Sequence, residues 1–487
     1  MAIKKNQNIN RVLLTEVLTQ QYSQVKTNEK VNANIQLLAQ DNTFTICTAH
    51  QPNIFTGHLY FIYKILHACK LAEELKAEMK EANFVPVYYM GSEDADLDEL
   101  GEVVVNGEKY KWETAQQGAV GRMKVDAALL NIIDRMEGQL GVEPFGQEAM
   151  SKLRNAYQPG RTIEQATFHL VHELFADYGL LVLLPDHADL KKIFIPVAQR
   201  ELTAHFSHQA VAETIDAFPQ AYKIQVKGRD INLFYLKDDI RARIEKQGDD
   251  FVVHGTAMRF SEQEMMEELH AHPERFSPNV ILRPVFQEMI LPNVAFIGGG
   301  GELAYWLELK RVFEKSAVPF PVLLLRNSFS LLEDTVLSKM NKLGLAAEVF
   351  FQSEENIVRY WLTKNEKLHA DLREEKTQLS QVYQQIKNRT SDIDVTLEKH
   401  TGALLHKALY RLDQLEKKME KALVKKHEAE VRQIEKIKRR LYPDGILQER
   451  IDNYFTYHAR WGEALMEQLY LHSKGMQQQF CCISLQP

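Results

Sequence analysis

His50, Gly57 and His58 fall in a short segment whose residue types could bind a phosphate group. An apolar run ends at Thr48, and apolar residues recur at helical spacing from Leu59, which predicts a loop between a strand and a helix. The N–H groups and dipole of such a helix attract anions, and imidazoles beside them can neutralise developing charge. A structural, hydrogen-bonded His50 and an exposed first-turn His58 are the alternatives.

An acidic cluster follows the next predicted strand. Glu93, Asp94, Asp96 and Glu99 lie within seven positions of one another. Such a cluster could bind Mg²⁺, orient a substrate ammonium, or hold one carboxylate as a general base. The alternative is an acidic helix start stabilised by the helix dipole, which fits Asp98 and Glu99. Glu93 and Asp94, directly after the strand, fit a site better.

Four consecutive glycines stand between another predicted strand and a helix that begins near Glu302. Glycine runs cost backbone entropy and are expected where a ligand or a chain segment approaches closely, although a tight turn is the alternative. Tyr305 and Trp306 could stack on a base, with core packing expected for one of them. The glycines are Gly298, Gly299, Gly300 and Gly301.

Arg326, Asn327 and Ser328 follow the last predicted strand, and could clamp phosphate oxygens in bidentate fashion. A surface salt bridge is the alternative for the arginine. Arg283 and Gln287 form a comparable set.

Alternation of strands and helices positions these groups. Strands are predicted at 44–48, 84–90, 180–184 and 321–325, and further sheet-type sequence at 282–288. Strands joined by crossover helices predict an α/β fold with a parallel sheet, whose ligands bind beyond the carboxyl ends of the strands. The candidate loops fall at these ends.

The remaining sequence divides around this core. Val103–Trp112 predicts a hairpin with an Asn-Gly turn, and 223–226 and 231–236 alternate like strands. Two helical runs, 353–390 and 395–441, predict an antiparallel coiled coil with a seam through Ala408, Leu412, Leu415, Met419 and Leu423. The predicted parts are a helical arm (1–40), a core (41–335) with insertions at about 106–160 and 205–275, a coiled-coil domain (336–460), and a C-terminal segment (461–487) packing on the core.

Composition limits the function classes. The chain has 487 residues, 45% hydrophobic and 26% charged, as is ordinary for a soluble protein. A net charge of −7 argues against a surface built for nucleic acid. Four cysteines in no zinc-finger pattern predict no metal site and no zinc. No apolar run of about 18 residues and no secretory leader is seen, so a cytoplasmic protein is expected.

Many short blocks, in one order, resemble the bacillithiol-biosynthesis cysteine-adding family, the cysteine ligases. Two departures concern the site: Phe55-Thr-Gly-His58 stands where the family more often has Gly-Pro near His58, and Ala95 stands where it usually has His. The matching blocks are Gln51-Pro52 with Gly57 and Leu59-Tyr60, Glu93-Asp94 with Asp96, Leu282-Arg-Pro284, Gln287-Glu288, Leu291-Pro292, Gly301-Glu302 with Ala304-Tyr-Trp306, Pro321-Val322, Arg326 with Ser328, and Pro443 to Arg450.

The resemblance implies a Rossmann-like nucleotidyltransferase core, similar to class I aminoacyl-tRNA synthetases, with a coiled coil that pairs subunits into a homodimer. It implies a carbon–nitrogen ligase that adds L-cysteine to the amine of glucosaminyl-malate, with ATP and optionally Mg²⁺. The expected catalytic residues are His58, Glu93, Asp94 and Asp96. Expected nucleotide-binding residues are His50, Gln51, Gly57, Gly298 to Gly301, Glu302, Arg326, Asn327 and Ser328. Expected substrate-binding residues are Tyr60, Lys64, Arg283, Gln287, Tyr305 and Trp306.

Two rival functions stay open. An RNA-binding paralogue of a synthetase would use the coiled coil to grip tRNA, against which the acidic total counts. A dimer whose nucleotide site has decayed would keep the fold without the activity, against which the retained glycines, acids and Arg326 count.

Overall fold

The structure is a computed structural model that describes residues 2–365 and 371–485. The chain forms two compact units. The first comprises 1–330 and 449–483, so the chain leaves it and returns to it, and the second comprises 331–448. Two strands, β13 (Ser328–Glu333) and β14 (Phe480–Leu485), span the limits of the units along the sequence.

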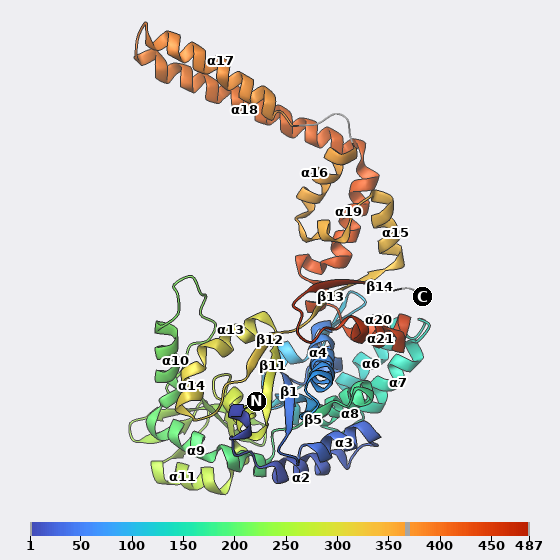
Figure 1. Cartoon of the computed structure of the whole chain (residues 1–487), viewed down its shortest axis with the longest axis vertical. Coiled ribbons are helices and arrows are strands. Elements are labelled where there is room, and N and C mark those ends of the chain that lie inside the picture. Colours follow the sequence, from blue (N-terminus) through green and yellow to red (C-terminus); the bar gives the residue numbers. More distant parts are fainter. Residues whose placement is uncertain (1, 366–370, 486–487) are drawn as a thin grey trace. The chain divides into compact units, whose positions relative to one another are not determined.

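A five-stranded parallel sheet forms the centre of the first unit (Figure 1). Its strand order is β12-β11-β1-β2-β5. The chain therefore builds outward from β1 in one direction and later from β11 in the other, so the order reverses between β1 and β11. In β1 and β2 nearly every residue is buried, as is typical of parallel strands covered on both faces. The strands are β1 (Thr43–His50), β2 (Asn83–Met90), β5 (Leu181–Leu183), β11 (Asn293–Gly298) and β12 (Val322–Leu325).

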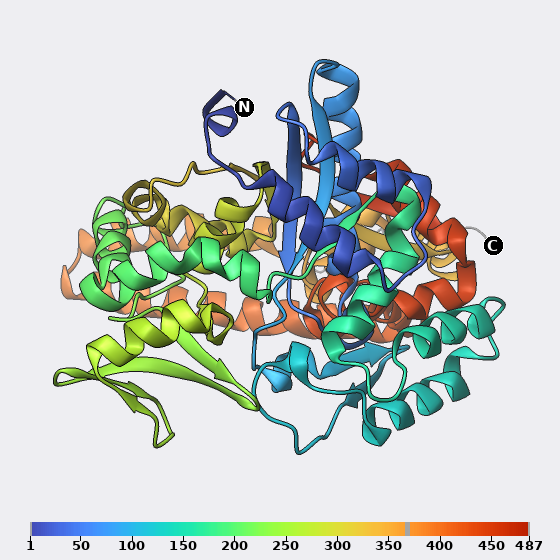
Figure 2. The same ribbon diagram turned by 90° about the horizontal axis from the view of Figure 1, so that it is seen from below.

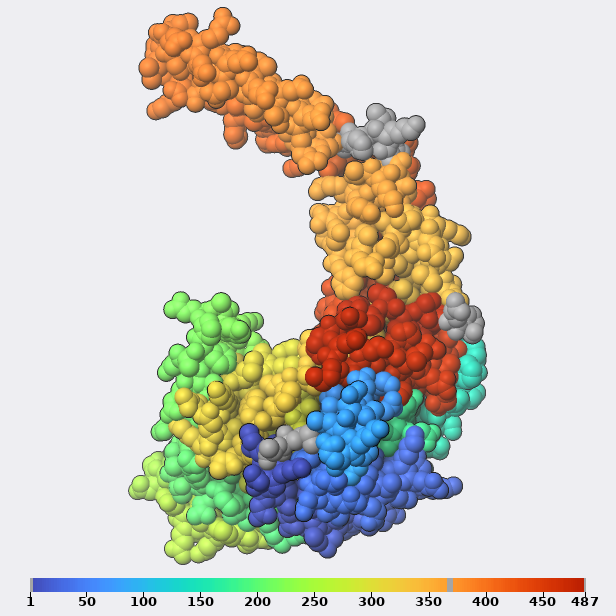
Figure 3. Space-filling model, in the orientation of Figure 1, coloured from blue at the N-terminus to red at the C-terminus, as the bar shows by residue number. Residues whose placement is uncertain are grey.

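Helix α4 (Leu59–Glu78) connects β1 to β2 and packs against both strands. Its Ala68 and Leu71 join Phe44 and Ile46 of β1 in one apolar cluster. The segment after residue 449 packs on the same helix, with α21 (Glu463–His472) against α4 (Figure 3). Other helices of the first unit include α1 (Ala2–Lys5), α2 (Arg11–Tyr22), α3 (Glu29–Leu37), α8 (Ile163–Phe175), α9 (Ala188–Ala204), α13 (Gly300–Glu308), α14 (Lys310–Lys315) and α20 (Tyr454–Trp461).

The predicted hairpin is confirmed as β3 (Glu102–Val105) and β4 (Glu108–Lys111), with Asn106 and Gly107 both at positive φ in the turn. Helices α5 (Leu97–Leu100), α6 (Ala127–Leu140) and α7 (Gly146–Ala156) flank it in the sequence.

An antiparallel sheet of order β10-β6-β7-β8-β9 forms beside α11 (Glu262–Ala271) and apart from the parallel sheet (Figure 2). The prediction of a strand at 223–226 was wrong, because that segment has no ladder partner; the alternation at 231–236 corresponds to β6. Helix α10 (Phe206–Asp216) precedes this sheet. The strands are β6 (Leu233–Lys237), β7 (Ile240–Gln247), β8 (Asp250–Val253), β9 (Arg259–Phe260) and β10 (Phe276–Pro278).

The prediction of sheet-type sequence at 282–288 was also wrong. This segment is α12 (Arg283–Ile290). Pro284 lies in its first turn, where the missing N–H costs no hydrogen bond. Leu282, Val285, Phe286 and Ile290 are all buried and follow helical rather than alternating spacing.

The second unit is helical. The first predicted run divides into α16 and α17, and 366–370 within it lie outside the described residues; the second divides at His427 into α18 and α19. Helices α17 and α18 pack as a hairpin (Figure 1). Four of the five predicted seam residues are partly buried, whereas Leu415 is 47% exposed. The helices are α15 (Asp334–Leu343), α16 (Glu354–Asn365), α17 (Arg373–Ser391), α18 (Thr396–Lys426) and α19 (Glu428–Leu441). Among the described residues, none of the helices has the length and apolar character to span a bilayer.

Candidate active site

A cavity of about 470 Å³ lies at the carboxyl ends of the parallel strands. Residues at or just after the ends of all five strands line it: His50 at the end of β1, Glu93 after β2, Pro185 after β5, Gly299 after β11 and Arg326 after β12. The cavity includes the position where the strand order reverses, between β1 and β11, at which Rossmann-type sheets bind ligands. The first histidine-bearing loop, the acidic cluster and the glycine run thus contribute to one cavity.

The glycine run forms the N-terminus of α13. Gly299, Gly300 and Gly301 line the cavity, and a Cβ added at Gly300 or Gly301 would meet no atom within 4 Å. Gly298 is different, because a Cβ there would lie 2.8 Å from Leu303 Cδ2. Gly298 is therefore closely packed, whereas Gly300 and Gly301 leave open space beside the first turn of α13.

Lys64 connects the two sides of the strand-order reversal. Its buried ammonium donates to the carbonyl of Ala49 at 2.5 Å and to Glu302 Oε2 at 2.7 Å. The same carboxylate oxygen accepts the N–H of Gly299 at 3.3 Å. Burial lowers the pKa of Lys64, and the Glu302 carboxylate opposes this shift. The lysine therefore fixes the first turn of α13 relative to the end of β1.

Arg283 presents a guanidinium to the cavity without a carboxylate partner among the described residues. It donates to Gln287 Oε1 at 3.1 Å and to the Tyr305 hydroxyl at 3.2 Å, and lies over the ring of Tyr89. Gln287 itself is buried behind it. Trp306 is fully buried and stacks on Phe296, so the expectation that one of the two aromatic residues packs in the core is confirmed.

Arg326 lines the cavity but already has a partner. Its two terminal nitrogens donate to the Glu449 carboxylate at 2.9 and 2.6 Å, and both side chains are buried. The Ser328 hydroxyl accepts a further bond at 3.1 Å, and the Asn327 amide donates to the carbonyl of Lys474. Asn327 and Ser328 do not line the cavity. The bidentate pairing predicted for Arg326 occurs with a protein carboxylate, and a phosphate contact stays a prediction.

The acidic cluster divides into three kinds of residue. Glu93, at the cavity wall, forms a buried ion pair with Lys191, and burial raises the pKa of Glu93. Asp94 also lines the cavity and accepts from the amides of Ala95 and Gln51. Asp96 is exposed, caps α5 by accepting the N–H of Glu99, and does not line the cavity. The helix-start alternative is confirmed for Asp98 and Glu99, which lie in the first turn of α5 after the N-cap Asp96, and Glu99 also lines the cavity.

The two histidines of the first loop differ in position. His50 lines the cavity, and its buried Nε2 has no hydrogen-bond partner. Burial and the nearby Lys64 hold the pKa of His50 well below its usual value, so the imidazole is neutral. His58 does not line the cavity; its Nδ1 lies 3.2 Å from the Ile451 carbonyl, and burial lowers its pKa.

The end of this loop is held by the segment after residue 449. Asn453 donates to the carbonyls of Phe55 and Gly57 at 2.8 and 2.6 Å, and the Leu59 N–H donates to the Asp452 carbonyl at 2.8 Å. Gly57 has φ +61°, and a Cβ there would lie 2.8 Å from the side chain of Asn53. The first N–H of α4 is thus bonded within the protein.

Sequence reasoning missed several residues of the site. Arg241, from the antiparallel sheet, lies 3.7 Å from Asp94 and lines the cavity, as does Arg450. Lys191 and Glu449 do not line the cavity but form ion pairs with the lining residues Glu93 and Arg326. Asp186, 3.4 Å from Lys191, carries a sequence signal because it follows a predicted strand. Glu449 and Arg450 belong to the block at 443–450 that resembles the family, whereas Arg241 and Lys191 carry no such signal, since their partners are distant in sequence.

Comparison with known proteins agrees with this architecture. The family described as "Bacillithiol biosynthesis BshC, N-terminal Rossmann-like domain" matches residues 1–327, and "Bacillithiol biosynthesis BshC, C-terminal coiled-coil domain" matches 329–485. Curated relatives named "Putative cysteine ligase BshC" include those of Flavobacterium johnsoniae (37% identical over 98% of this chain and 90% of the relative), Christiangramia forsetii (39%, over 94% and 86%) and Cytophaga hutchinsonii (38%, over 98% and 90%).

A solved structure titled as a putative arginyl-tRNA synthetase from Campylobacter jejuni aligns with 96% of this chain and all of that chain, at 12% identity. Its TM-score of 0.21 is too low to support an argument. The fold rests on the parallel sheet and on the two family matches, and the chain belongs to the bacillithiol biosynthesis BshC family.

Proposed function

We propose that this protein is a ligase that joins L-cysteine to the amine of glucosaminyl-malate, with ATP activating the cysteine carboxylate. The observation that carries the proposal is one cavity that holds both the first turn of α13, with open space at Gly300 and Gly301, and the guanidinium of Arg283, which has no carboxylate partner among the described residues. The first suits phosphate groups and the second suits a carboxylate. Cysteine is proposed as the substrate because the curated relatives are named as cysteine ligases.

In the proposed reaction, a carboxylate oxygen of cysteine attacks the α-phosphorus of ATP, and pyrophosphate leaves. The sugar amine then attacks the acyl carbonyl, and AMP leaves with the electron pair of the cleaved bond. The attacking nitrogen must lose a proton. His50 lines the cavity and has a neutral imidazole, so it is our candidate for the base. Glu93 and Asp94, already bonded to Lys191 and to amides, orient the amine.

ATP would lie with its phosphates at the first turn of α13, where Lys64 and Glu302 fix the backbone. Mg²⁺ would arrive bound to the ATP phosphates, because the Glu93 carboxylate is already paired with Lys191 and is not a free ligand for the ion. Arg283 would take a malate carboxylate. We further propose a cytoplasmic homodimer that forms through α17 and α18, which light scattering of the purified chain would test.

The test combines the purified protein with ATP, cysteine and glucosaminyl-malate, and follows products by mass spectrometry. Bacillithiol and AMP are expected in equal amounts. ADP and phosphate would contradict the adenylate step, and absence of bacillithiol would contradict the ligase. Arg283→Met should lower kcat/KM for glucosaminyl-malate roughly 10- to 100-fold, as for loss of a charge-assisted bond. Lys192→Met, at an exposed pair with Asp189, is the control and should leave activity unchanged.

A further inference from the structure

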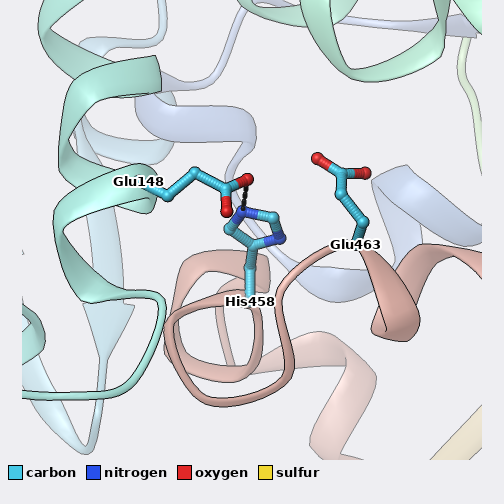
Figure 4. A group of neighbouring side chains, drawn as sticks. All are labelled: Glu148, His458 and Glu463. Atoms are coloured by element: carbon cyan, nitrogen blue, oxygen red, sulfur yellow. Dashed lines mark ion pairs between the residues drawn. The ribbon is translucent and has the colours of Figure 1, made fainter.

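A buried histidine lies between two glutamates from distant parts of the first unit (Figure 4). Glu148 is on α7, His458 is on α20 and Glu463 begins α21. One possible ligand atom from each residue lies within 4.8 Å of the other two. Imidazole nitrogen with carboxylate oxygens is a donor set that suits a divalent transition metal.

The local backbone brings these residues together. Gly462 has φ +57°, and a Cβ there would lie 2.7 Å from the Phe145 ring, so both the turn and the packing require glycine. The turn starts α21 directly after α20, which returns Glu463 toward His458. The N–H of Phe145 donates to the Ala459 carbonyl at 2.8 Å and fixes the start of α7 against α20.

His458 is poised as a ligand rather than satisfied as a core residue. Its side chain is fully buried, and its Nε2 has no hydrogen-bond partner although it lies 3.3 Å from Glu148 Oε1. Figure 4 shows this nitrogen directed at the Glu148 carboxylate. The Nδ1 of His458 lies 3.0 Å from the Tyr454 hydroxyl, which can hold the ring in place from behind.

Lys152 provides the cation of this cluster in the structure. Its ammonium lies 3.0 Å from Glu463 and 3.4 Å from Glu148, with Glu173 at 3.9 Å. Among the described residues no hydrogen bond joins this ammonium to His458 Nε2, so the imidazole does not share the positive centre that both carboxylates contact. A divalent ion would satisfy all three groups at once and displace the lysine to solvent.

We propose that Glu148, His458 and Glu463 bind a divalent transition-metal ion of the Zn²⁺ class, with water completing the coordination. The ion would join α7 to the segment after residue 449, and so stabilise the same segment that positions Glu449 and Asn453. The site uses no cysteine, and Glu148 lies more than 300 positions before His458 and Glu463 along the chain. The cysteine pattern that excluded zinc therefore has no bearing on it.

The experiment titrates the full-length, chelator-treated protein with Zn²⁺ against a chromophoric competitor, and repeats the binding with Co²⁺ to read its visible d–d bands. One ion per chain is expected. Glu463→Gln should weaken Zn²⁺ binding on the order of 100-fold, and because the Glu463 side chain is exposed, we expect this variant to fold. It accompanies His458→Asn, which removes the buried ligand. His254→Asn, at an exposed His–Glu pair, is the matched control and should bind as the wild type does.

Lys152→Gln distinguishes a metal site from a purely structural ion-pair cluster. Removing the competing positive charge should tighten Zn²⁺ binding roughly tenfold. The proposal is overturned if the wild type binds no stoichiometric ion, if His254→Asn weakens binding as much as Glu463→Gln does, or if Lys152→Gln weakens it. None of these measurements uses ATP or cysteine, so their outcome is independent of the ligase proposal.

Discussion

Replacing Glu449 with glutamine tests how the cavity wall is held. The Glu449 carboxylate accepts two bonds from Arg326, at 2.9 and 2.6 Å, and the two side chains are 1% and 4% exposed. Glu449→Gln retains the shape but leaves the buried guanidinium without a counter-charge. Because breaking a buried pair from one side costs about 3 to 5 kcal/mol, and glutamine keeps one acceptor, we expect a loss of about 3 kcal/mol in the free energy of unfolding.

This free energy converts to a temperature shift. An unfolding entropy of about 2.1 cal/mol/K per residue over roughly 360 residues of the first unit gives a fall in Tm of about 4 °C. Scanning calorimetry should record it in the transition of that unit, at several scan rates so that irreversible unfolding is recognised. Asp189→Asn is the matched control, since its pair with Lys192 is 50% and 61% exposed and is worth under about 1 kcal/mol.

Equal shifts for Glu449→Gln and Asp189→Asn would refute the reasoning. They would mean that Arg326 finds compensation elsewhere, in solvent or in the cavity. A shift well above 4 °C, in contrast, would mean that loss of Glu449 also releases the segment that follows it.

Two further predictions separate stability from activity and from pH. Gly301→Ala should raise the free energy of unfolding by up to about 1 kcal/mol, because alanine is the better helix residue and its Cβ meets open space. The same substitution should weaken ATP binding measured by calorimetry. Unchanged ATP affinity would contradict the proposed phosphate position. Burial and Asp186 raise the pKa of Glu164 to about 8, so between about pH 4.5 and 8 the folded state binds a proton that the unfolded state has lost. Unfolding titrations should therefore show the free energy of unfolding falling as pH rises through that window. Glu164→Gln should flatten this slope, and an identical slope in the variant would refute the assignment.

The sequence predicted the sheet, because its strands are short apolar runs bounded by glycine, proline and acidic residues. It also predicted which loops contribute to the cavity, since the carboxyl ends of parallel strands share one edge. It failed at Arg283–Ile290, where a short apolar run does not distinguish strand from buried helix. Partners such as Lys191 and Arg241 carried no local signal, because an ion pair between distant residues is fixed only by tertiary packing.

The two bonds from Asn453 to the loop at Phe55 and Gly57 impose an order on biosynthesis. The donor follows its acceptors by almost the whole length of the chain. At a translation rate of about 5 to 20 residues per second, Asn453 is synthesised roughly 20 to 80 s after the loop at Phe55 and Gly57. A nascent chain that has not yet reached Asn453 therefore lacks these two bonds, and the loop at Phe55 and Gly57 is held only after that residue has been made.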